Sequence, residues 1–291
     1  MISAIITSYK EPKTIGRAIE AIAEQKIKDI EIIVVAPDDE TLTVAKGYVK
    51  KIPEVKTIKD LGNGKSAALN LAVSKAKGDI LVLTDGDVYV GKKSVEKLTN
   101  GFKDSKVGAI SGNVISLDSN KNMYGYWSHV LTGIANELRI ETLNQNKPFI
   151  CTGYFFAIRK SLFPKLPEQL LSEDGYISQM VYSKGYLIKY AQDAKVYVKF
   201  PTNIKDWIIQ KKRSAGGYNQ IKKLTGTTYR SFGSEAKGGY RVLKYITNIK
   251  EFFWIIWLFI IRIYLWIVIY IDVNLKNKKQ NEIWKRVEST K

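Results

Sequence analysis

Short apolar runs alternate with amphipathic segments through the first third of the chain, as in proteins built around a parallel β-sheet. Four apolar runs predict strands at residues 2–7, 30–36, 55–58 and 80–83. Between the first two runs, apolar residues recur at helical spacing from Ala18 to Ala23. Strand, loop and helix repeat three times before residue 85, which predicts a parallel, doubly wound α/β sheet with helices on both faces, the usual frame for a nucleotide.

The same alternation continues to residue 200. It predicts helices at 94–102, 122–143 and 176–183, and strands at 107–115, 149–158, 186–191 and 196–200. Thr152 and Gly153 interrupt one of these strands, where the missing glycine side chain would let a ligand approach the backbone. The aromatic residues near the start of the second helix are expected to pack in the interior rather than to form a sugar platform; they are Tyr124, Tyr126 and Trp127.

A basic, amphipathic pattern covers residues 203–224 and favours a helix that lies on a membrane surface. Trp207 supplies part of its apolar side, and Gly216 and Gly217 are a candidate break in the helix. A loop rich in Gly, Ser and Thr follows at residues 225–239.

The most apolar stretch of the chain is residues 252–271. Its twenty residues contain one charge, Arg262, and about twenty apolar residues are the length that spans a bilayer. A helix lying in the interface, with Arg262 reaching the headgroups, is the alternative. Either arrangement predicts firm attachment to a membrane.

The charge of the chain is uneven. The net charge is +18, and residues 201–291 hold 18 basic and 6 acidic residues, so 12 of the 18 surplus charges belong to the last third. Basic residues beside an apolar helix indicate an anionic membrane surface, and the sequence has no nucleic-acid-binding motif. Cys151 and His129 are single residues of their kind, so no disulfide and no Cys/His metal cluster is expected. Met1 leads directly into a strand without a basic signal region, so the catalytic part is predicted to face the cytoplasm.

Two acidic motifs carry candidate chemistry. Asp85 and Asp87 flank a glycine after the strand at 80–83, and carboxylates at that edge of a sheet suit Mg²⁺ or Mn²⁺ and a diphosphate. Glu173 and Asp174 open a predicted helix. The alternatives are an Asp-rich turn for the first motif and an acidic turn that complements the helix dipole for the second.

A third motif, Gly64-Lys65-Ser66, is similar to the end of a phosphate-binding P-loop. That pattern needs a glycine where this chain has Lys59, so a P-loop nucleotidase is a minor alternative. Lys65 remains a suitable partner for a diphosphate because its ammonium group binds phosphate.

Taken together, these motifs resemble the inverting glycosyltransferases of family 2, which have the GT-A fold and include cellulose, hyaluronan and polyprenyl-phosphate sugar synthases. The resemblance covers about residues 1 to 215. It is carried by the stretches Thr7-Ser8-Tyr9-Lys10-Glu11, Asp38, Gly64-Lys65-Ser66-Ala67-Ala68-Leu69-Asn70, Asp85-Gly86-Asp87, Ser172-Glu173-Asp174 and Gln210-Lys211-Lys212-Arg213-Ser214. The domain organisation that follows is a GT-A domain (1–202), amphipathic interfacial helices and a loop (203–250), a hydrophobic membrane helix (251–272) and a basic tail (273–291).

The resemblance implies a role for each matching residue. Nucleotide-binding residues would be Thr7, Tyr9, Glu11, Asp38, Lys65, Asn70 and Asp85, with Asp85 and Asp87 holding Mg²⁺ or Mn²⁺. Asp174 would be the general base, and Glu173, Gln210 and Arg213 would bind the acceptor or diphosphate. The membrane-bound synthases have a Trp in the acceptor-sugar site where this chain has Ser214, which argues against a polysaccharide acceptor.

The sequence therefore predicts a membrane-associated, metal-dependent inverting glycosyltransferase. Its donor would be a nucleotide-diphosphate sugar, UDP-linked in preference to GDP-linked, and its acceptor a polyprenyl phosphate or lipid-bound glycan. A polysaccharide synthase is one alternative. A non-catalytic module that binds nucleotides or anionic lipids at a membrane surface is another. No nucleic-acid partner and no particular oligomeric state is predicted.

Overall fold

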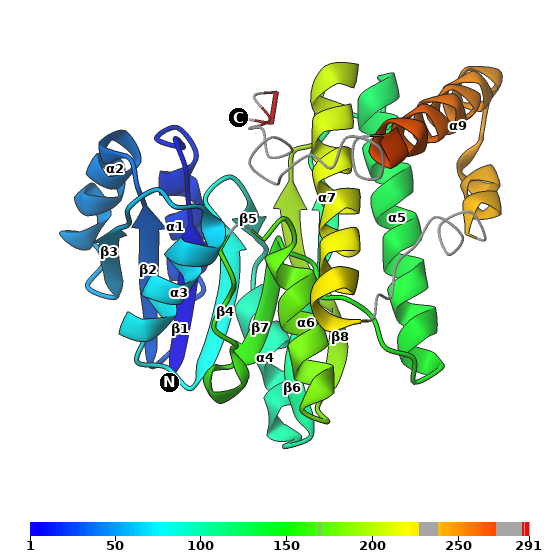
Figure 1. The fold of residues 1–291 in the computed structure, drawn as a ribbon. Coiled ribbons are helices and arrows are strands. Elements are labelled where there is room, and N and C mark those ends of the chain that lie inside the picture. Colours follow the sequence, from blue (N-terminus) through cyan, green and yellow to red (C-terminus); the bar gives the residue numbers. More distant parts are fainter. Residues whose placement is uncertain (169, 227–237, 272–286, 288, 291) are drawn as a thin grey trace.

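The computed structural model describes residues 1–168, 170–226, 238–271, 287 and 289–290 (Figure 1). Its helices and strands are, in chain order, β1 (Ile2–Thr7), α1 (Ile15–Ala23), β2 (Ile30–Ala36), α2 (Asp39–Val49), β3 (Val55–Lys59), α3 (Lys65–Lys75), β4 (Ile80–Asp85), β5 (Tyr89–Val90), α4 (Ser94–Thr99), η1 (Asn100–Lys103), β6 (Val107–Ser116), α5 (Met123–Asn144), β7 (Phe155–Arg159), η2 (Lys160–Leu162), α6 (Glu173–Ser183), β8 (Leu187–Val198), α7 (Ile204–Thr225), η3 (Gly239–Tyr245) and α9 (Ile249–Tyr270). The predicted loop at 225–239 and the basic tail fall largely outside the described residues.

The strands form one sheet in the order β3-β2-β1-β4-β7-β6-β8-β5. The first four are parallel, as predicted. The rest of the sheet is mixed, because β7 runs antiparallel to both of its neighbours, β4 and β6, and β5 runs antiparallel to β8. A strand buried on both faces reads as an apolar run in either direction, so the sequence pattern did not reveal the reversal.

Helices cover both faces of the sheet, as predicted. Residues of α1, α2 and α4 pack with one face of the strands, and their core includes Ile6, Ile19 and Leu98. Residues of α3 and α6 pack on the opposite face, with Leu69 and Ile177 in the core. The sheet is therefore buried between two layers, and its ends are the exposed places where a ligand can bind.

Two strand predictions were wrong in the second half of the sheet. The segment predicted as a strand at 149–158 becomes one only at Phe155. Before it, the backbone N–H groups of Cys151 and Thr152 donate to the side-chain oxygens of Ser178 and Ser111, each at 3.0 Å. These hydroxyl groups satisfy the backbone N–H groups of a buried loop that has no strand partner there.

The predicted strand pair after residue 186 is the single strand β8, which lies beside β6. The register of this pair shifts between Ser111 and Asn113, whose partners on β8 are Tyr190 and Lys195. β8 contains extra residues at this point, which form a bulge-like irregularity, and the strand continues beyond it. The gap between the two predicted strands falls at this irregularity.

α7 continues through Gly216 and Gly217, so the predicted break is absent. Both glycines are buried, and a Cβ atom on Gly217 would lie 2.6 Å from the Cβ of Ser172. Gly175 of α6 likewise leaves room for Ile221 of α7. The glycines thus allow α7 to approach the start of α6 closely.

The C-terminal helices pack on α5 through a separate apolar cluster. Trp127, which is fully buried, donates from Nε1 to the carbonyl oxygen of Trp254 at 2.8 Å, and its ring lies 5.8 Å from that of Trp207. The expectation that Tyr126 and Trp127 serve packing is confirmed. Trp207 is 3% exposed. Trp207, on the apolar side of α7, is therefore covered by protein. The contact of α7 with a membrane surface stays a prediction.

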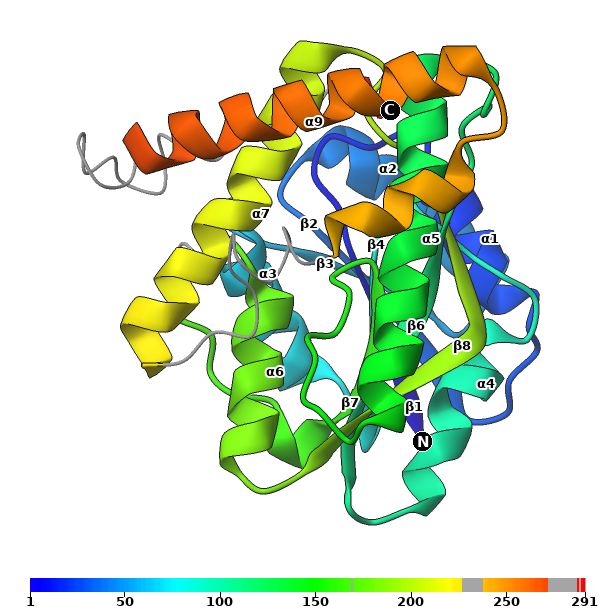
Figure 2. The ribbon, with the colours of Figure 1, turned by 90° about the vertical axis from the view of Figure 1, so that its right-hand side faces the viewer.

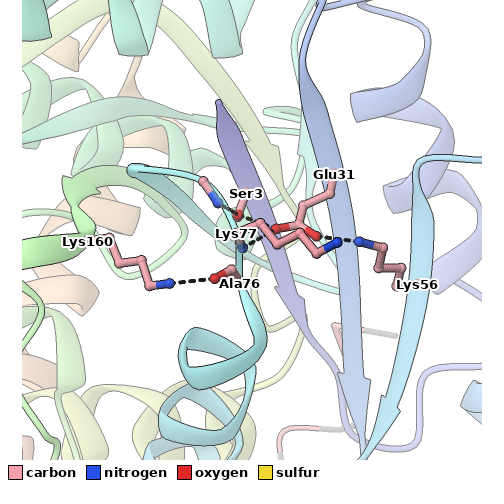
Figure 3. A network of polar contacts seen from close by, with 7 residues as sticks. Ser3, Glu31, Lys56, Ala76, Lys77 and Lys160 are labelled. Atoms are coloured by element: carbon pink, nitrogen blue, oxygen red, sulfur yellow. Dashed lines mark hydrogen bonds and ion pairs between the residues drawn. The ribbon is translucent and has the colours of Figure 1, made fainter.

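A polar network fastens the opposite end of the sheet, away from the carboxyl ends of the parallel strands (Figure 3). Glu31 of β2 is 2% exposed and accepts from Ser3 Oγ at 2.6 Å and from Lys56 Nζ at 2.7 Å. It also accepts from the backbone N–H of Lys77, just before β4. These hydrogen bonds compensate for the buried charge of Glu31. They also join β1, β2 and β3 to the residues before β4, at the end of the sheet away from the predicted motifs.

Candidate active site

A cavity of about 1200 Å³ lies at the carboxyl ends of β1 and β4 and extends to residues of α5, α7 and α9. Ten of the twelve site residues predicted from the sequence line it: Thr7, Tyr9, Glu11, Lys65, Asp85, Asp87, Glu173, Asp174, Gln210 and Arg213. The fold thus brings together side chains from five separate stretches of the chain.

Asp85, the last residue of β4, forms the centre of one end of the cavity. Its Oδ1 accepts from Thr7 Oγ1 at 2.8 Å and lies 2.5 Å from Lys65 Nζ. Thr7 and Asp85 are paired across the parallel strands β1 and β4, and Lys65 begins α3. Burial opposes the charge of Lys65, but the nearby carboxylates of Asp85 and Glu173 outweigh it and raise the pKa of the ammonium. This end of the cavity therefore keeps a fixed cation beside the predicted diphosphate site.

Gly86 lets the two aspartates lie close to the first motif. A Cβ atom on Gly86 would lie 2.4 Å from Ser8 Oγ and 2.5 Å from Glu11 Oε2. Ser8 Oγ in turn donates to Glu11 Oε2 at 2.7 Å, and Glu11 is 8% exposed. The glycine between Asp85 and Asp87 is thus required by packing, and any larger residue would push the loop away from the cavity.

Two predicted site residues do not line the cavity. Asp38 caps α2, accepting from the backbone N–H of Thr41 at 2.9 Å and of Lys10 at 2.7 Å. Asn70 donates to the carbonyl oxygen of Leu166 at 2.9 Å and accepts from its N–H at 3.0 Å. In this structure Asp38 shapes the loop that carries Tyr9, and Asn70 holds a loop beside α3.

Asp60 is a cavity residue that the sequence reasoning missed. Its Oδ1 accepts from the N–H of Gly62 at 2.7 Å, while Oδ2 is buried and has no hydrogen-bond partner among the described residues. Burial raises the pKa of this carboxyl group. The only signal in the sequence was an acidic residue at the end of the strand at 55–58, the same position after a strand that drew attention to Asp85.

Asp174 lies at the start of α6, on the wall of the cavity. Its Oδ1 accepts from Ser172 Oγ at 2.6 Å and from the N–H of Gly175 at 2.9 Å. A Cβ atom on Gly153 would lie 3.1 Å from Oδ2 of Asp174. Gly153 was expected to let a ligand approach, and it leaves space for this carboxylate. The two hydrogen bonds fix the orientation of the group.

α7 contributes the remaining polar groups. Gln210 is 7% exposed; its Nε2 donates to Tyr154 Oη at 3.4 Å, and its Oε1 has no partner among the described residues. Arg213, one turn further along, lines the same cavity. Ser214, which replaces the Trp of the synthase motif, donates from Oγ to the carbonyl oxygen of Gln210 at 3.2 Å. Gln210 Oε1 is thus a buried acceptor available to a donor group of a ligand.

The aspartate pair suits a divalent cation. Within the described part of the chain, no three or more His, Cys, Asp or Glu side chains are grouped so that they could hold a metal by themselves. Mg²⁺ is commonly bound by one or two carboxylates together with phosphate oxygens and water. Asp85 and Asp87 face the same cavity and supply this kind of donor set, so they fit a metal that binds with a diphosphate.

Comparison with solved structures identifies the fold as that of the GT-A glycosyltransferases. Residues 1–349 of TarS from Staphylococcus aureus give a TM-score of 0.53 at 16% identity, covering 84% of this chain and 70% of that one. TarS 1–349 in complex with UDP-GlcNAc gives a TM-score of 0.51, covering 84% of this chain and 71% of that one, also at 16% identity.

Sequence comparison identifies the family. The model of glycosyl transferase family 2 matches residues 3–166, more than half of the chain, and the protein belongs to this family of enzymes. A probable glycosyltransferase of Bacillus subtilis, YdaM, is 27% identical over 76% of this chain and 56% of its own length. The poly-β-1,6-N-acetyl-D-glucosamine synthase of Staphylococcus aureus is 24% identical over 91% of this chain and 64% of its own length. The chain thus spans less than two thirds of each of these relatives.

Proposed function

We propose that this enzyme is a membrane-associated, metal-dependent inverting glycosyltransferase that moves a sugar from a UDP-sugar to a lipid-linked acceptor, either a polyprenyl phosphate or a lipid-bound glycan. The observation that carries the proposal is the composition of the single cavity described above. It joins Lys65, Asp85 and Asp87 at one end to apolar residues of α5 and α9 at the other, with Asp174 on its wall.

The donor end favours a nucleotide-diphosphate sugar. Lys65 and Arg213 supply cations for the diphosphate, and a metal at Asp85 and Asp87 would neutralise further charge on the leaving group. Tyr9 and Asp60 line the same end and offer a ring and a carboxylate to a nucleobase. TarS has been crystallised with UDP-GlcNAc and with UDP, which supports a UDP-linked donor here.

The arrangement of carboxylates favours inversion. In the proposed step, an acceptor oxygen forms a bond to the anomeric carbon while the bond from that carbon to the diphosphate oxygen breaks. The leaving nucleoside diphosphate takes the electron pair, and Asp174 takes the proton of an acceptor hydroxyl group. Ser172 and the N–H of Gly175 orient Asp174 for this role. The step needs one base and no carboxylate nucleophile.

The other end of the cavity favours a lipid-linked acceptor. Its apolar lining includes side chains from α5 and α9: Leu131, Ile134, Leu138, Leu258, Ile263 and Trp266. Arg262, the charge in the middle of the apolar helix, lines the cavity as well. An apolar wall with a guanidinium group suits a molecule with a hydrocarbon chain and an anionic phosphate.

A polysaccharide acceptor is the second candidate, and the similarity to the poly-β-1,6-N-acetyl-D-glucosamine synthase over 91% of this chain is the observation that favours it. Ser214 in place of the motif Trp argues against it. The two candidates differ in product, since a synthase makes a polymer from the donor, whereas the proposed enzyme makes one lipid-linked sugar. Membership of an enzyme family removes the reason to propose a non-catalytic module or a P-loop nucleotidase.

A donor screen tests the proposal. Purified protein in detergent is incubated with a panel of UDP- and GDP-sugars, Mn²⁺ or Mg²⁺, and polyprenyl phosphate, and nucleotide release is measured with and without EDTA. We expect release from one UDP-sugar that depends on both the metal and the acceptor. Release from a GDP-sugar alone would overturn the donor assignment, and the absence of binding to every donor by calorimetry would overturn the site assignments.

A further inference from the structure

α9 has two different faces along its whole length. One stripe packs on α5 and α7 and is almost fully buried; it consists of Ile255, Leu258, Ile261, Leu265 and Ile269. The opposite face is exposed by 40 to 61% and entirely apolar or aromatic; it consists of Phe252, Phe253, Ile256, Trp257, Phe259, Ile260, Ile263, Tyr264 and Ile267. We call this second set the outer face of α9. Figure 2 shows the helix lying across α5 and α7.

The outer face carries no charge. From residue 252 to residue 270 the one charged residue of α9 is Arg262, and it lines the cavity beneath the helix. Within the described part of the chain, α9 is also the one helix long and apolar enough to cross a membrane, judged by length and composition. A contiguous apolar surface of this kind marks an interaction site.

The N-terminal end of α9 is fastened to the catalytic domain. η3, which directly precedes it, is joined to α5 by Arg241, whose two terminal nitrogens lie 2.6 and 2.7 Å from the carboxylate oxygens of Glu141. Tyr245 Oη donates to Glu137 Oε1 at 2.9 Å. The chain therefore enters α9 from the side of the catalytic domain.

The chain also returns to the catalytic domain after α9. The N–H of Ser289 donates to Asp206 Oδ2 at 2.9 Å, and the N–H of Thr202 donates to Ser289 Oγ at 3.3 Å. Val287 and Thr290 are buried at 7% and 6% exposure and line the cavity. The sequence between α9 and this contact contains seven charged residues from Asp272 to Arg286, which is too polar to cross a bilayer. The residues before and after α9 thus both contact the catalytic domain, so both flanks of the helix lie on the same side of any membrane that α9 meets.

We propose that α9 lies in the plane of the membrane and that its outer face is the surface by which the enzyme docks on an anionic bilayer. A spanning orientation would place one flank of the helix across the membrane from the catalytic domain. Because α9 packs against α7, it would also draw Lys211 and Lys212 of α7 into the hydrocarbon region of the bilayer.

Charge complementarity selects an anionic lipid surface as the occupant. Lys250 lies in the first turn of α9, with its ammonium group 4.6 Å from the centre of the Trp254 ring, while Lys244 of η3 pairs with Glu137 of α5. The last third of the chain carries a net charge of +12. Tyr240 and Leu243 of η3 are 66% and 61% exposed, so the segment before α9 also presents apolar side chains to solvent. Exposed apolar rings next to basic residues bind anionic interfaces.

The inference rests on the membrane attachment in the proposed function and adds its geometry. Since α9 is also a wall of the cavity, docking through the outer face would bring that wall against the lipid. A lipid-linked acceptor could then reach the cavity without leaving the membrane.

Depth measurements on the full chain test this proposal. Single cysteines replace Ile256, Ile260, Tyr264 and Ile267 on the outer face, with Leu187→Cys at the start of β8 as the matched exposed control. The native Cys151 can stay, because it is buried and burial raises its pKa to about 12, so it reacts slowly at neutral pH. Each variant is spin-labelled and bound to vesicles that contain phosphatidylglycerol, and its depth is measured by collision with oxygen and with a water-soluble nickel complex.

We expect all four outer-face labels to lie at one shallow depth and the control label to stay in water. A spanning helix would instead separate the labels at 256 and 267 by up to about 16 Å in depth, at 1.5 Å per residue, and that result would overturn the proposal. Failure of the protein to bind vesicles would overturn it too.

Donor turnover is measured on the same samples. Turnover with deep or aqueous labels would refute the in-plane orientation and leave the enzymatic proposal standing. Shallow labels without turnover of any donor would support the docking surface and refute the catalytic proposal.

Discussion

The ammonium nitrogen of Lys65 lies 2.5 Å from Oδ1 of Asp85, so the first residue of α3 and the last residue of β4 form an ion pair inside the cavity. Because Thr7 donates to the same oxygen, Oδ1 is engaged twice. Asp85 and Asp87 would hold the metal, which would neutralise charge on the diphosphate. In our proposal, Lys65 stabilises the negative charge that develops on the leaving diphosphate.

Replacement of Lys65 by Met is therefore expected to lower kcat/KM for the donor by about 10²-fold, the effect of removing one group that stabilises a developing anion. Lys59→Met is the matched control. Lys59 also pairs with an aspartate, Asp39 at 2.7 Å, but on the exposed surface, where such a pair contributes little. Steady-state nucleotide release measures both variants. Equal losses in the two would refute the role of Lys65.

The role of Asp174 predicts a dependence on the acceptor. Asp174→Asn should lower transfer to a hydroxyl acceptor by about 10²–10⁴-fold, the range for loss of a general base. A phosphate acceptor, with a second pKa of about 6, carries little proton at pH 7, so its loss should be smaller. Donor affinity by calorimetry should not change. Transfer to a hydroxyl acceptor at the wild-type rate would exclude Asp174 as the base.

Two aspartates with opposite pKa shifts give opposite predictions for stability. Burial raises the pKa of Asp60 above its usual value of 3.8. The native state then holds a proton that the unfolded state has lost, so stability falls as pH rises through this window. Asp60→Asn should therefore raise the Tm of the ligand-free protein at pH 7, and the gain should vanish below the usual value. A gain of about 1 kcal/mol in the free energy of unfolding would raise the Tm by roughly 2–4 °C in a chain of this size.

Asp38 is the counterpart. Burial opposes its ionisation, but hydrogen bonds from Thr41 and from the backbone N–H of Lys10 outweigh this and lower its pKa. The stabilisation that the ionised Asp38 carboxylate provides is present above pH 3.8 and is lost as the pH falls through the lowered pKa. Asp38→Ala should destabilise the protein by about 1 kcal/mol at pH 7, as for loss of a helix cap. Thermal unfolding at pH 3 to 8 compares both variants with wild type. Shifts of the same sign at pH 7 would contradict this assignment.

Arg262 is predicted to serve the acceptor. Arg262→Gln should raise the KM for polyprenyl phosphate by about 10-fold, the loss of one charge-assisted hydrogen bond, with a much smaller change in the KM for the donor. Lys222→Gln on the exposed end of α7 is the control for a general loss of positive charge. If the control raises the acceptor KM as much as Arg262→Gln, net charge and not a specific contact explains the effect.

The sequence predicted the first half of the fold correctly because β1 to β4 and their helices follow the regular βα pattern. It did not predict the direction of β7, because a strand buried on both faces has the same apolar pattern in either direction. It also suggested a break at Gly216 and Gly217. The intrinsic cost of glycine in a helix is overcome there by the close packing of α7 against Ser172, a contact between distant parts of the chain.

The motifs identified the residues that share the cavity, because those before α7 follow a strand or open a helix at the same edge of the sheet. Gln210 and Arg213 lie within α7, which lines the same cavity. Asp38 and Asn70 matched the family pattern too, but their side chains are engaged by Thr41 and Leu166, contacts that the sequence does not reveal. Asp60 was overlooked because it stands alone in the sequence. Its significance comes from a buried oxygen without a partner in the described structure, which depends on three-dimensional packing.

The stereochemistry and linkage of the product show whether the enzyme inverts the anomeric carbon and whether its acceptor is a lipid. With the donor found by the screen and polyprenyl phosphate or a lipid-bound glycan in vesicles, NMR of the lipid product gives the anomeric configuration of the transferred sugar. A UDP-sugar with an α linkage should yield one sugar in β linkage on the lipid, and Asp174→Asn should lower the amount of product on the glycan acceptor by about 10²–10⁴-fold. A product with retained α configuration, or a polymer that is not attached to lipid, would contradict the account.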